Sequence, residues 1–312
     1  MKRALFVILA LAALTPSGSA PVALVTGIVF ALTLGNPFSG ETKRFTAPLL
    51  QLAVMGLGAG MNLRVIARVG AVGIGYTALG IVLTLALGTL LARALRADSD
   101  TALLISVGTA ICGGSAIAAV APVIRARSHQ TSVALAVVFL LNAVALIVFP
   151  IVGHALGLGA PAFGLWSALA IHDTSSVVGA ASQFGPDALE VATTVKLARA
   201  LWIVPVTLVI ARHRAARTGG GTHAALKRPW FILGFVLMAG LITWQPALHE
   251  IGQAIAECAR HLLVLTLFLI GSAISRDALR SVGARPLVHG VALWIAVATV
   301  SLGSILAGWI HL

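Results

Sequence analysis

The feature that most constrains this chain is a regular alternation of long apolar segments with short polar joints. Segments of about 20 apolar residues are long enough to cross a bilayer as helices. Hydrophobic residues make up 59% of the chain and charged residues 10%, against about 25% charge in soluble domains. We therefore predict an all-α, polytopic membrane protein of about 9–11 transmembrane segments. The predicted segments are 4–15, 20–35, 45–62, 70–93, 101–126, 130–152, 161–184, 187–212, 229–245, 255–275 and 286–311.

These segments leave room for one linker, the basic stretch 212–228, which contains three consecutive glycines. Basic loops stay in the cytoplasm, so we place this loop there and treat 1–312 as a single transmembrane transporter domain. The net charge of +12 resides at segment ends, which fits the positive-inside rule and argues against nucleic acid as a partner. The two cysteines, Cys112 and Cys258, are too few and too far apart for a metal framework, and no cofactor motif occurs.

Two interpretations of residues 1–20 stay open. A basic start, an apolar run and the small residues 17–20 are typical of a cleaved signal peptide. The same residues also fit a short first helix, broken at Pro16, that stays in the mature protein. We favour retention because a second apolar run follows directly.

Internal similarity indicates an inverted repeat. Residues 57–70 resemble 270–283 at a constant offset of 213, which aligns Gly58 with Gly271 and Asn62 with Ser275. A fainter match sets 111–115 beside 171–175, and each is followed by a helix with a late proline, at Pro150 or Pro205. Two-fold repeats of this kind are common in secondary transporters.

The number of membrane crossings between the two members of the second match decides whether they point in opposite directions. This count favours hairpins over helices that cross fully. The members point in opposite directions only if 101–126 and 161–184 are re-entrant hairpins that enter and leave on one side. Hairpins also keep Arg125 and Arg127 cytoplasmic and put the charge-free loop 153–160 outside. Broken helices that cross fully are the main alternative.

Three polar constellations interrupt the apolar segments. The first is Cys112-Gly113-Gly114-Ser115. Paired glycines predict an unwound helix, and a half-helix that begins near Ser115 would aim free N–H groups at an anion. Close helix packing by small residues explains the glycines equally without a break.

The second constellation is the run His172 to Ser176, where Asp173 is the one acidic residue in the middle of an apolar segment. A carboxylate at that depth costs about 3 kcal/mol and usually marks a transport pathway. We expect the hydroxyls of Thr174, Ser175 and Ser176 to cap a half-helix over 177–182 and to suit an oxyanion. His172 and Asp173 are candidates for proton coupling. Alternatively, Asp173 forms a structural ion pair.

The third constellation places Thr193, Lys196 and Arg199 on one face of a helix that starts at Pro186. Asp173 can neutralise one of the two cations, which leaves about one positive charge for an anionic substrate. Snorkelling to the interface, or a structural pair with Glu190 or Asp173, is the alternative.

Other polar positions carry weaker signals. Asn62 and Ser275 fit helix capping as well as binding, and Asn142 fits an interhelical hydrogen bond. The spacing of the remaining histidines supports no metal site, and we expect them at membrane interfaces. These are His154, His249, His261 and His289. The absence of a nucleophile elbow argues against a hydrolase.

Together these motifs resemble the sulfate exporter family of bacterial inner-membrane proteins, in the same order over nearly the whole chain. The resemblance implies a secondary transporter distantly related to bile-acid/sodium symporters and cation–proton antiporters. The family's recurring positions match at Cys112, Gly113, Gly114, Ser115, His172, Asp173, Lys196 and Arg199. The family usually has a His-Glu pair and a further His three residues on, where this chain has Asp173 and Ser176. That departure weakens any relay that needs two histidines.

We therefore expect a multi-pass bacterial inner-membrane protein, not an enzyme, that exports a sulfate-, sulfite- or sulfonate-like oxyanion with the proton gradient. A sodium- or proton-coupled carrier of an organic carboxylate is one alternative. A membrane enzyme or assembly subunit without transport is another. The expected partners are the small anion and the lipid bilayer, and a homo-oligomer is compatible with the sequence.

Overall fold

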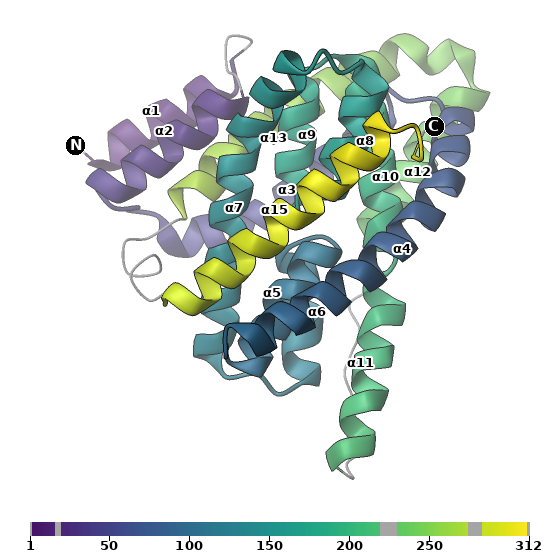
Figure 1. Cartoon of the computed structure of the whole chain (residues 1–312). Helices are drawn as coiled ribbons and strands as arrows, with labels where there is room; N and C mark the ends of the chain where they lie inside the picture. Colours follow the sequence, from purple (N-terminus) through teal and green to yellow (C-terminus); the bar gives the residue numbers. More distant parts are fainter. Residues whose placement is uncertain (1, 16–19, 219–229, 274–282, 311–312) are drawn as a thin grey trace. The chain divides into compact units, whose positions relative to one another are not determined.

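The computed structural model describes residues 2–15, 20–218, 230–273 and 283–310 (Figure 1). Every regular element in these ranges is helical, which confirms the all-α prediction. The helices are α1 (Lys2–Ala13), α2 (Ala20–Thr33), α3 (Ser39–Gly58), α4 (Leu63–Ala94), α5 (Ser99–Ala110), α6 (Gly114–Val123), α7 (Ser128–Ala155), α8 (Ala160–Ala170), α9 (Thr174–Ser182), α10 (Pro186–Ala200), α11 (Ile203–Thr218), α12 (Trp230–Trp244), α13 (His249–Ser272) and α15 (Ala284–Leu306), with a 3-10 turn at Pro246–Leu248.

Within the described ranges, five stretches are long and apolar enough to cross a membrane, and the chain is a multi-pass membrane protein in contact with lipid. They are Leu63–Ala94, Ser128–Ala155, Pro186–Arg214, His249–Ser272 and Ala284–Leu306. The predicted segments fall on the observed helices, with ends displaced by up to seven residues. Pro16, Ser275 and most of the linker 212–228 lie outside the described residues.

The described residues form two compact units, and α4 contributes its first turns to one and the rest to the other. The first unit comprises 2–15, 20–68 and 230–273, and the second comprises 69–218 and 283–310. Whether 1–312 acts as a single domain stays a prediction.

Two helix pairs of the first unit make equivalent close contacts. A Cβ atom added to Gly58 of α3 would lie 2.4 Å from the carbonyl oxygen of Phe235 in α12. A Cβ added to Gly271 of α13 would lie 2.3 Å from the carbonyl oxygen of Leu24 in α2. Only glycine permits such an approach of two backbones. The two glycines that the sequence repeat aligns therefore make the same kind of contact.

Helices α3 and α13 also run in opposite directions, as an inverted repeat requires. Gly56 lies against Ala259, whereas Ala59, further along α3, lies against Gly252, which is earlier in α13. Helix α1 packs on this pair through Phe6, whose ring centroid lies 5.1 Å from that of Phe268.

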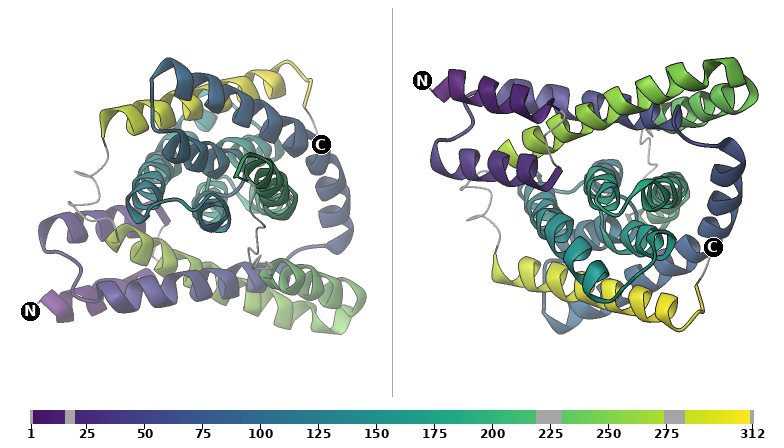
Figure 2. Two further views of the ribbon diagram at one scale, coloured as in Figure 1. Left: turned by 90° about the horizontal axis from the view of Figure 1, so that it is seen from below. Right: turned by 90° about the horizontal axis from the view of Figure 1, so that it is seen from above.

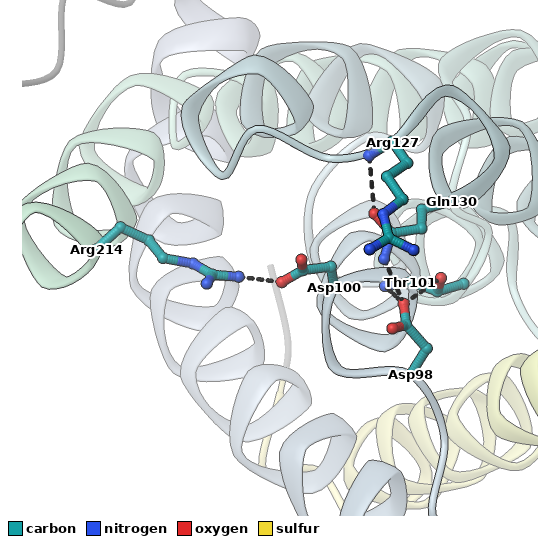
Figure 3. Close-up of polar contacts among 6 residues, drawn as sticks. All are labelled: Asp98, Asp100, Thr101, Arg127, Gln130 and Arg214. Carbon is teal, nitrogen blue, oxygen red and sulfur yellow. Dashed lines mark hydrogen bonds and ion pairs between the residues drawn. The ribbon is translucent and has the colours of Figure 1, made fainter. Parts of the chain in front are cut away.

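In the second unit, α5 and α6 form a re-entrant hairpin beside α7. Asp98, the N-cap of α5, accepts a hydrogen bond of 2.8 Å from Nε2 of Gln130 in the first turn of α7 (Figure 3). Since only residues 124–127 separate α6 from α7, the start of α5 and the end of α6 lie at the same end of this unit. An ion pair between Asp100 and Arg214 joins α11 to the same end (Figure 3).

Helices α8 and α9 form a second hairpin at the opposite end of α7. Phe163, in the first turn of α8, stacks on Phe184, which follows α9, with 3.7 Å between ring centroids. Both rings contact Gly153 near the end of α7. The described residues therefore confirm the hairpin hypothesis over full crossing. Figure 2 shows α15 along one side of the helices that are seen end-on.

Candidate functional site

Each hairpin breaks at its tip over three residues, and the two breaks are equivalent. Helix α5 ends at Ala110 and α6 begins at Gly114, while α8 ends at Ala170 and α9 begins at Thr174. An offset of 60 therefore superposes both helix ends, as the match of 111–115 with 171–175 predicts. Gly113 has a φ of +67°, a left-handed conformation that favours glycine.

The two tips touch each other. A Cβ added to Gly113 would lie 3.5 Å from the carbonyl oxygen of His172 and 3.6 Å from the Cα of Asp173. Asn142 of α7 fixes the second tip, because its Oδ1 accepts a hydrogen bond of 3.1 Å from the His172 amide. Asn142 does bond another segment, as predicted, but the donor lies in the break between α8 and α9 and not in a helix.

Arg199 of α10 is 2% exposed and joins both hairpins through their carbonyl groups. Its Nε donates to Ala110 at 2.6 Å, and its Nη1 donates to Leu169 at 2.5 Å. Two longer bonds reach the carbonyls of Thr109 and Ala168. The acceptors are C-terminal carbonyls of α5 and α8, which carry the negative end of the helix dipole.

Lys196 of the same helix is fully buried and binds the second hairpin alone. Its Nζ donates to the carbonyl of Ile171 at 2.5 Å and to that of Ala168 at 3.4 Å. Neither Lys196 nor Arg199 snorkels, since both side chains end inside the unit. Thr193 is buried on the same helix, and its hydroxyl has no hydrogen-bond partner among the described residues.

Asp173 does not form the predicted ion pair. Among the described residues, no carboxylate oxygen lies within 4.0 Å of Lys196 or Arg199. Asp173 is instead the N-cap of α9, and its Oδ2 accepts from the Ser176 amide at 3.1 Å and from the hydroxyls of Ser175 and Ser176. The prediction that a hydroxyl caps this helix, over 177–182, is wrong. A carboxylate is the stronger partner for a helix N-terminus.

The remaining predicted residues gather at the same tips. Cys112 is buried, and its sulfur interacts with the amide of Ala116 in the first turn of α6. Ser115 is exposed and Gly114 is half-buried, so the N-terminus of α6 is open. Thr174, Ser175 and Ser176 are buried around the Asp173 carboxylate.

His172 is fully buried, and neither ring nitrogen has a hydrogen-bond partner in the described part of the chain. Its imidazole interacts electrostatically with the charges of Lys196 and Arg199. The structure therefore brings Gly113, the residues of the second tip, Lys196 and Arg199 together, whereas Ser115 is exposed at the start of α6. They come from the two hairpin tips and from α10.

Of two further polar residues, the sequence predicts the role of one wrongly and that of the other correctly. His289 was predicted at an interface, but it is buried on α15, with Nε2 3.2 Å from the Ser106 hydroxyl of α5. No sequence signal identifies Ser106 as its partner. Asn62 does cap a helix, since its Oδ1 accepts a hydrogen bond of 2.9 Å from the Arg64 amide.

No group of three or more histidine, cysteine, aspartate or glutamate side chains in the described ranges is arranged to hold a metal ion. The tips do hold several charged groups and dipoles. Two buried cations face carbonyl dipoles, and one carboxylate faces amides and hydroxyls.

Comparison with known proteins gives a consistent picture. The family model described as conserved hypothetical protein 698 matches residues 4–290. A UPF0324 membrane protein of Bdellovibrio bacteriovorus is 57% identical over 308 residues, which cover 98% of this chain and 94% of that protein.

Two further UPF0324 membrane proteins extend the similarity. That of Geobacter sulfurreducens is 45% identical, over 99% of this chain and 98% of that protein. One of Vibrio vulnificus is 46% identical, over 96% of this chain and 97% of that protein. No solved structure matches this chain. The chain therefore belongs to the conserved hypothetical protein 698 family and is a multi-pass bacterial membrane protein.

Proposed function

We propose that this protein is a secondary active transporter, with no enzymatic activity, that exports a small oxyanion such as sulfate, sulfite or a sulfonate. The observation that carries the proposal is the pair of buried cations, Lys196 and Arg199, at the meeting point of two broken helices. Neither cation has a carboxylate partner within 4.0 Å among the described residues. Broken helices whose ends meet near the middle of the membrane are a recurrent design of transporter binding sites.

An approximate sum of charges supports an anionic substrate. Lys196 and Arg199 supply two positive charges, and Asp173 supplies one negative charge. Each helix terminus acts as about half a charge. The C-termini of α5 and α8 and the N-termini of α6 and α9 therefore cancel. About one positive charge is left, and in an apolar interior it attracts an anion strongly.

The Asp173 carboxylate also supports coupling to protons. It accepts hydrogen bonds from the amide and the hydroxyls at the N-terminus of α9. These are the donors that an oxyanion would bind. Protonation of Asp173 weakens its hold on these donors and makes them available to the substrate. His172, which lies beside Asp173 and has no hydrogen-bond partner in the described residues, is the second candidate for proton transfer.

A thermal-shift screen of the purified protein tests the anion site. Sulfate, sulfite, methanesulfonate and acetate are compared with chloride at matched ionic strength. A ligand at 100 times its dissociation constant stabilises the protein by about 2.7 kcal/mol. We expect one of the sulfur oxyanions to raise the melting temperature in a saturable way.

The matched variants are Lys196→Gln and Arg212→Gln. Lys196 is buried at the tips, whereas Arg212 is an exposed cation on α11. We expect the oxyanion shift to vanish in Lys196→Gln and to persist in Arg212→Gln. A shift only with acetate would favour the carboxylate carrier. No shift with any of these anions would contradict the anion site.

A further inference from the structure

The second unit contains a cavity of about 290 Å³ beside the hairpin tips. Its walls come from the middle of α4, the end of α15, α8 and α10, and residues 309 and 310. Leu169 and Arg199, which are hydrogen-bonded to each other, both line it. The cavity therefore adjoins the cationic site and shares Leu169 and Arg199 with it, while α4 and α15 supply most of its wall.

The wall of this cavity offers few free polar groups to a ligand. Half of its lining residues carry aliphatic side chains, and Arg199 is the one charged residue among them. Its threonine and serine hydroxyls donate within their own helices, and Tyr76 adds one further hydroxyl to the lining. Thr84 donates to the carbonyl of Gly80 at 2.6 Å, and Ser301 donates to that of Val297 at 2.6 Å. A bare inorganic ion in such a space would lose its hydration without replacement.

Arg199 gives the cavity its charge. Four hydrogen bonds from its guanidinium reach backbone carbonyls, and a guanidinium has five N–H donors. One donor is therefore uncommitted among the described residues, and the charge has no carboxylate partner there. An uncharged hydrocarbon in the cavity would leave this charge uncompensated.

We propose that this cavity holds the apolar body of an organic anion whose acidic head group interacts with Arg199. The inference rests on the proposed transport function and narrows its substrate to an alkyl or aryl sulfonate or carboxylate. The volume corresponds to about ten water-sized units at about 30 Å³ each. A hexanesulfonate, with six carbons and one sulfonate group, fits this size.

Two glycines of α4 allow a matched test. Gly80 lines the cavity, and a Cβ added there meets no atom within 4 Å. Gly75 is equally open but does not line the cavity. Leucine at position 80 therefore fills the cavity without a backbone clash, while leucine at position 75 adds the same side chain to the same helix elsewhere.

The experiment measures binding of methanesulfonate, propanesulfonate and hexanesulfonate to the full chain in lipid nanodiscs by calorimetry. Each methylene that enters the cavity should raise the affinity about fourfold in the wild type and in Gly75→Leu. Gly80→Leu should abolish this gain with chain length while keeping the affinity for methanesulfonate. Hexan-1-ol, which lacks the charge, should not bind.

The outcomes separate the two proposals. If methanesulfonate binds but the longer sulfonates bind no better, the cavity proposal is wrong and the anion site stands. If a longer alkyl chain improves binding equally in Gly80→Leu and Gly75→Leu, the alkyl chain lies outside this cavity. If hexan-1-ol binds as well as hexanesulfonate, the ligand binds as a lipid would, without need of Arg199. Either result overturns the proposal. If no sulfonate binds, the cavity proposal fails, and the transport proposal fails with it only if sulfate and sulfite do not bind either.

Discussion

The Nε atom of Arg199 donates a hydrogen bond to the carbonyl oxygen of Ala110, 2.6 Å away. Ala110 is the last residue of α5, so this bond ties α10 to the tip of the first hairpin. The same guanidinium bonds Leu169 near the end of α8. A single buried side chain thus holds two half-helices that enter the unit from opposite ends, and carbonyl groups serve where a carboxylate was expected.

Removal of Arg199 should destabilise the fold. In Arg199→Ala the four carbonyls lose their charged donor in an apolar interior, and each such bond contributes about 1.5–3 kcal/mol. We expect a loss of at least about 3 kcal/mol, and a smaller loss in Arg199→Lys, which keeps the charge but not the geometry. Thermal unfolding in detergent measures this. Arg212→Ala, at an exposed site of α11, is the control, and equal melting temperatures for all variants would disprove the role.

The contacts of Gly58 and Gly271 should be equally intolerant of a side chain. An added Cβ would lie 2.4 Å and 2.3 Å from backbone oxygens, so Gly58→Ala and Gly271→Ala must separate their helix pairs. Overpacking of this kind costs about 1–3 kcal/mol. Gly75→Ala in α4, where a Cβ meets nothing within 4 Å, should be neutral or stabilising by up to about 1 kcal/mol. If Gly58→Ala lowers the stability and Gly271→Ala does not, the two repeats are not structurally equivalent.

Sequence patterns located the helices and their breaks because those depend on local residue types. Apolar segment length, the glycine pair at 113–114 and the polar run after Ile171 each act within a few residues. Pro186 begins α10 as predicted. The break between α10 and α11 was missed, although Pro205, in the first turn of α11, signals it, because proline rarely sits inside a helix.

The hydrogen-bond partners of the buried polar side chains could not be predicted in the same way. The acceptors of Arg199 lie about thirty and ninety residues earlier in the chain, and backbone carbonyls leave no signature in a sequence. The sequence does contain a signal for the role of Asp173, since an Asp three residues before Ser176 at a helix start is typical of an N-cap. The pairing of His289 with Ser106 depends on how α15 packs against α5, which local residue types do not reveal.

The base of the first hairpin should respond to acid. Burial raises the pKa of Asp98, but hydrogen bonds from Thr101 and Gln130 and the charge of Arg127 outweigh it, so the pKa is lowered from its ordinary value of 3.8. The folded state therefore binds this proton less readily than the unfolded state. The carboxylate stabilises the hairpin above pH 3.8, and this stabilisation is lost as the pH falls through the folded-state pKa.

Asp98→Asn measures that contribution. The difference in melting temperature between wild type and variant should be largest near neutral pH and should shrink towards about pH 3. Asp187, in the first turn of α10, supplies the control variant Asp187→Asn. A difference that grows on acidification would contradict the sign of the pKa shift.

Coupling to protons should depend on Asp173. Asparagine is also a good N-cap, so Asp173→Asn should keep the contact with Ser176 and fold normally. It should lose the dependence of oxyanion flux on a pH gradient in proteoliposomes, because the side chain no longer titrates. Normal gradient-driven flux in this variant would remove Asp173 from the mechanism.

The proposed anion transport rests on two buried cations that have no carboxylate partner in the part of the chain that the structure describes. Counterflow in proteoliposomes tests it most directly. Vesicles loaded with unlabelled sulfite or sulfate are diluted into radiolabelled anion, with Arg212→Gln as a matched control for the loss of one positive charge. We predict transient, saturable accumulation of label in the wild type and in Arg212→Gln, and none in folded Lys196→Gln. Accumulation in Lys196→Gln equal to that of the wild type, or no counterflow of any sulfur oxyanion or sulfonate in the wild type, would contradict the proposal.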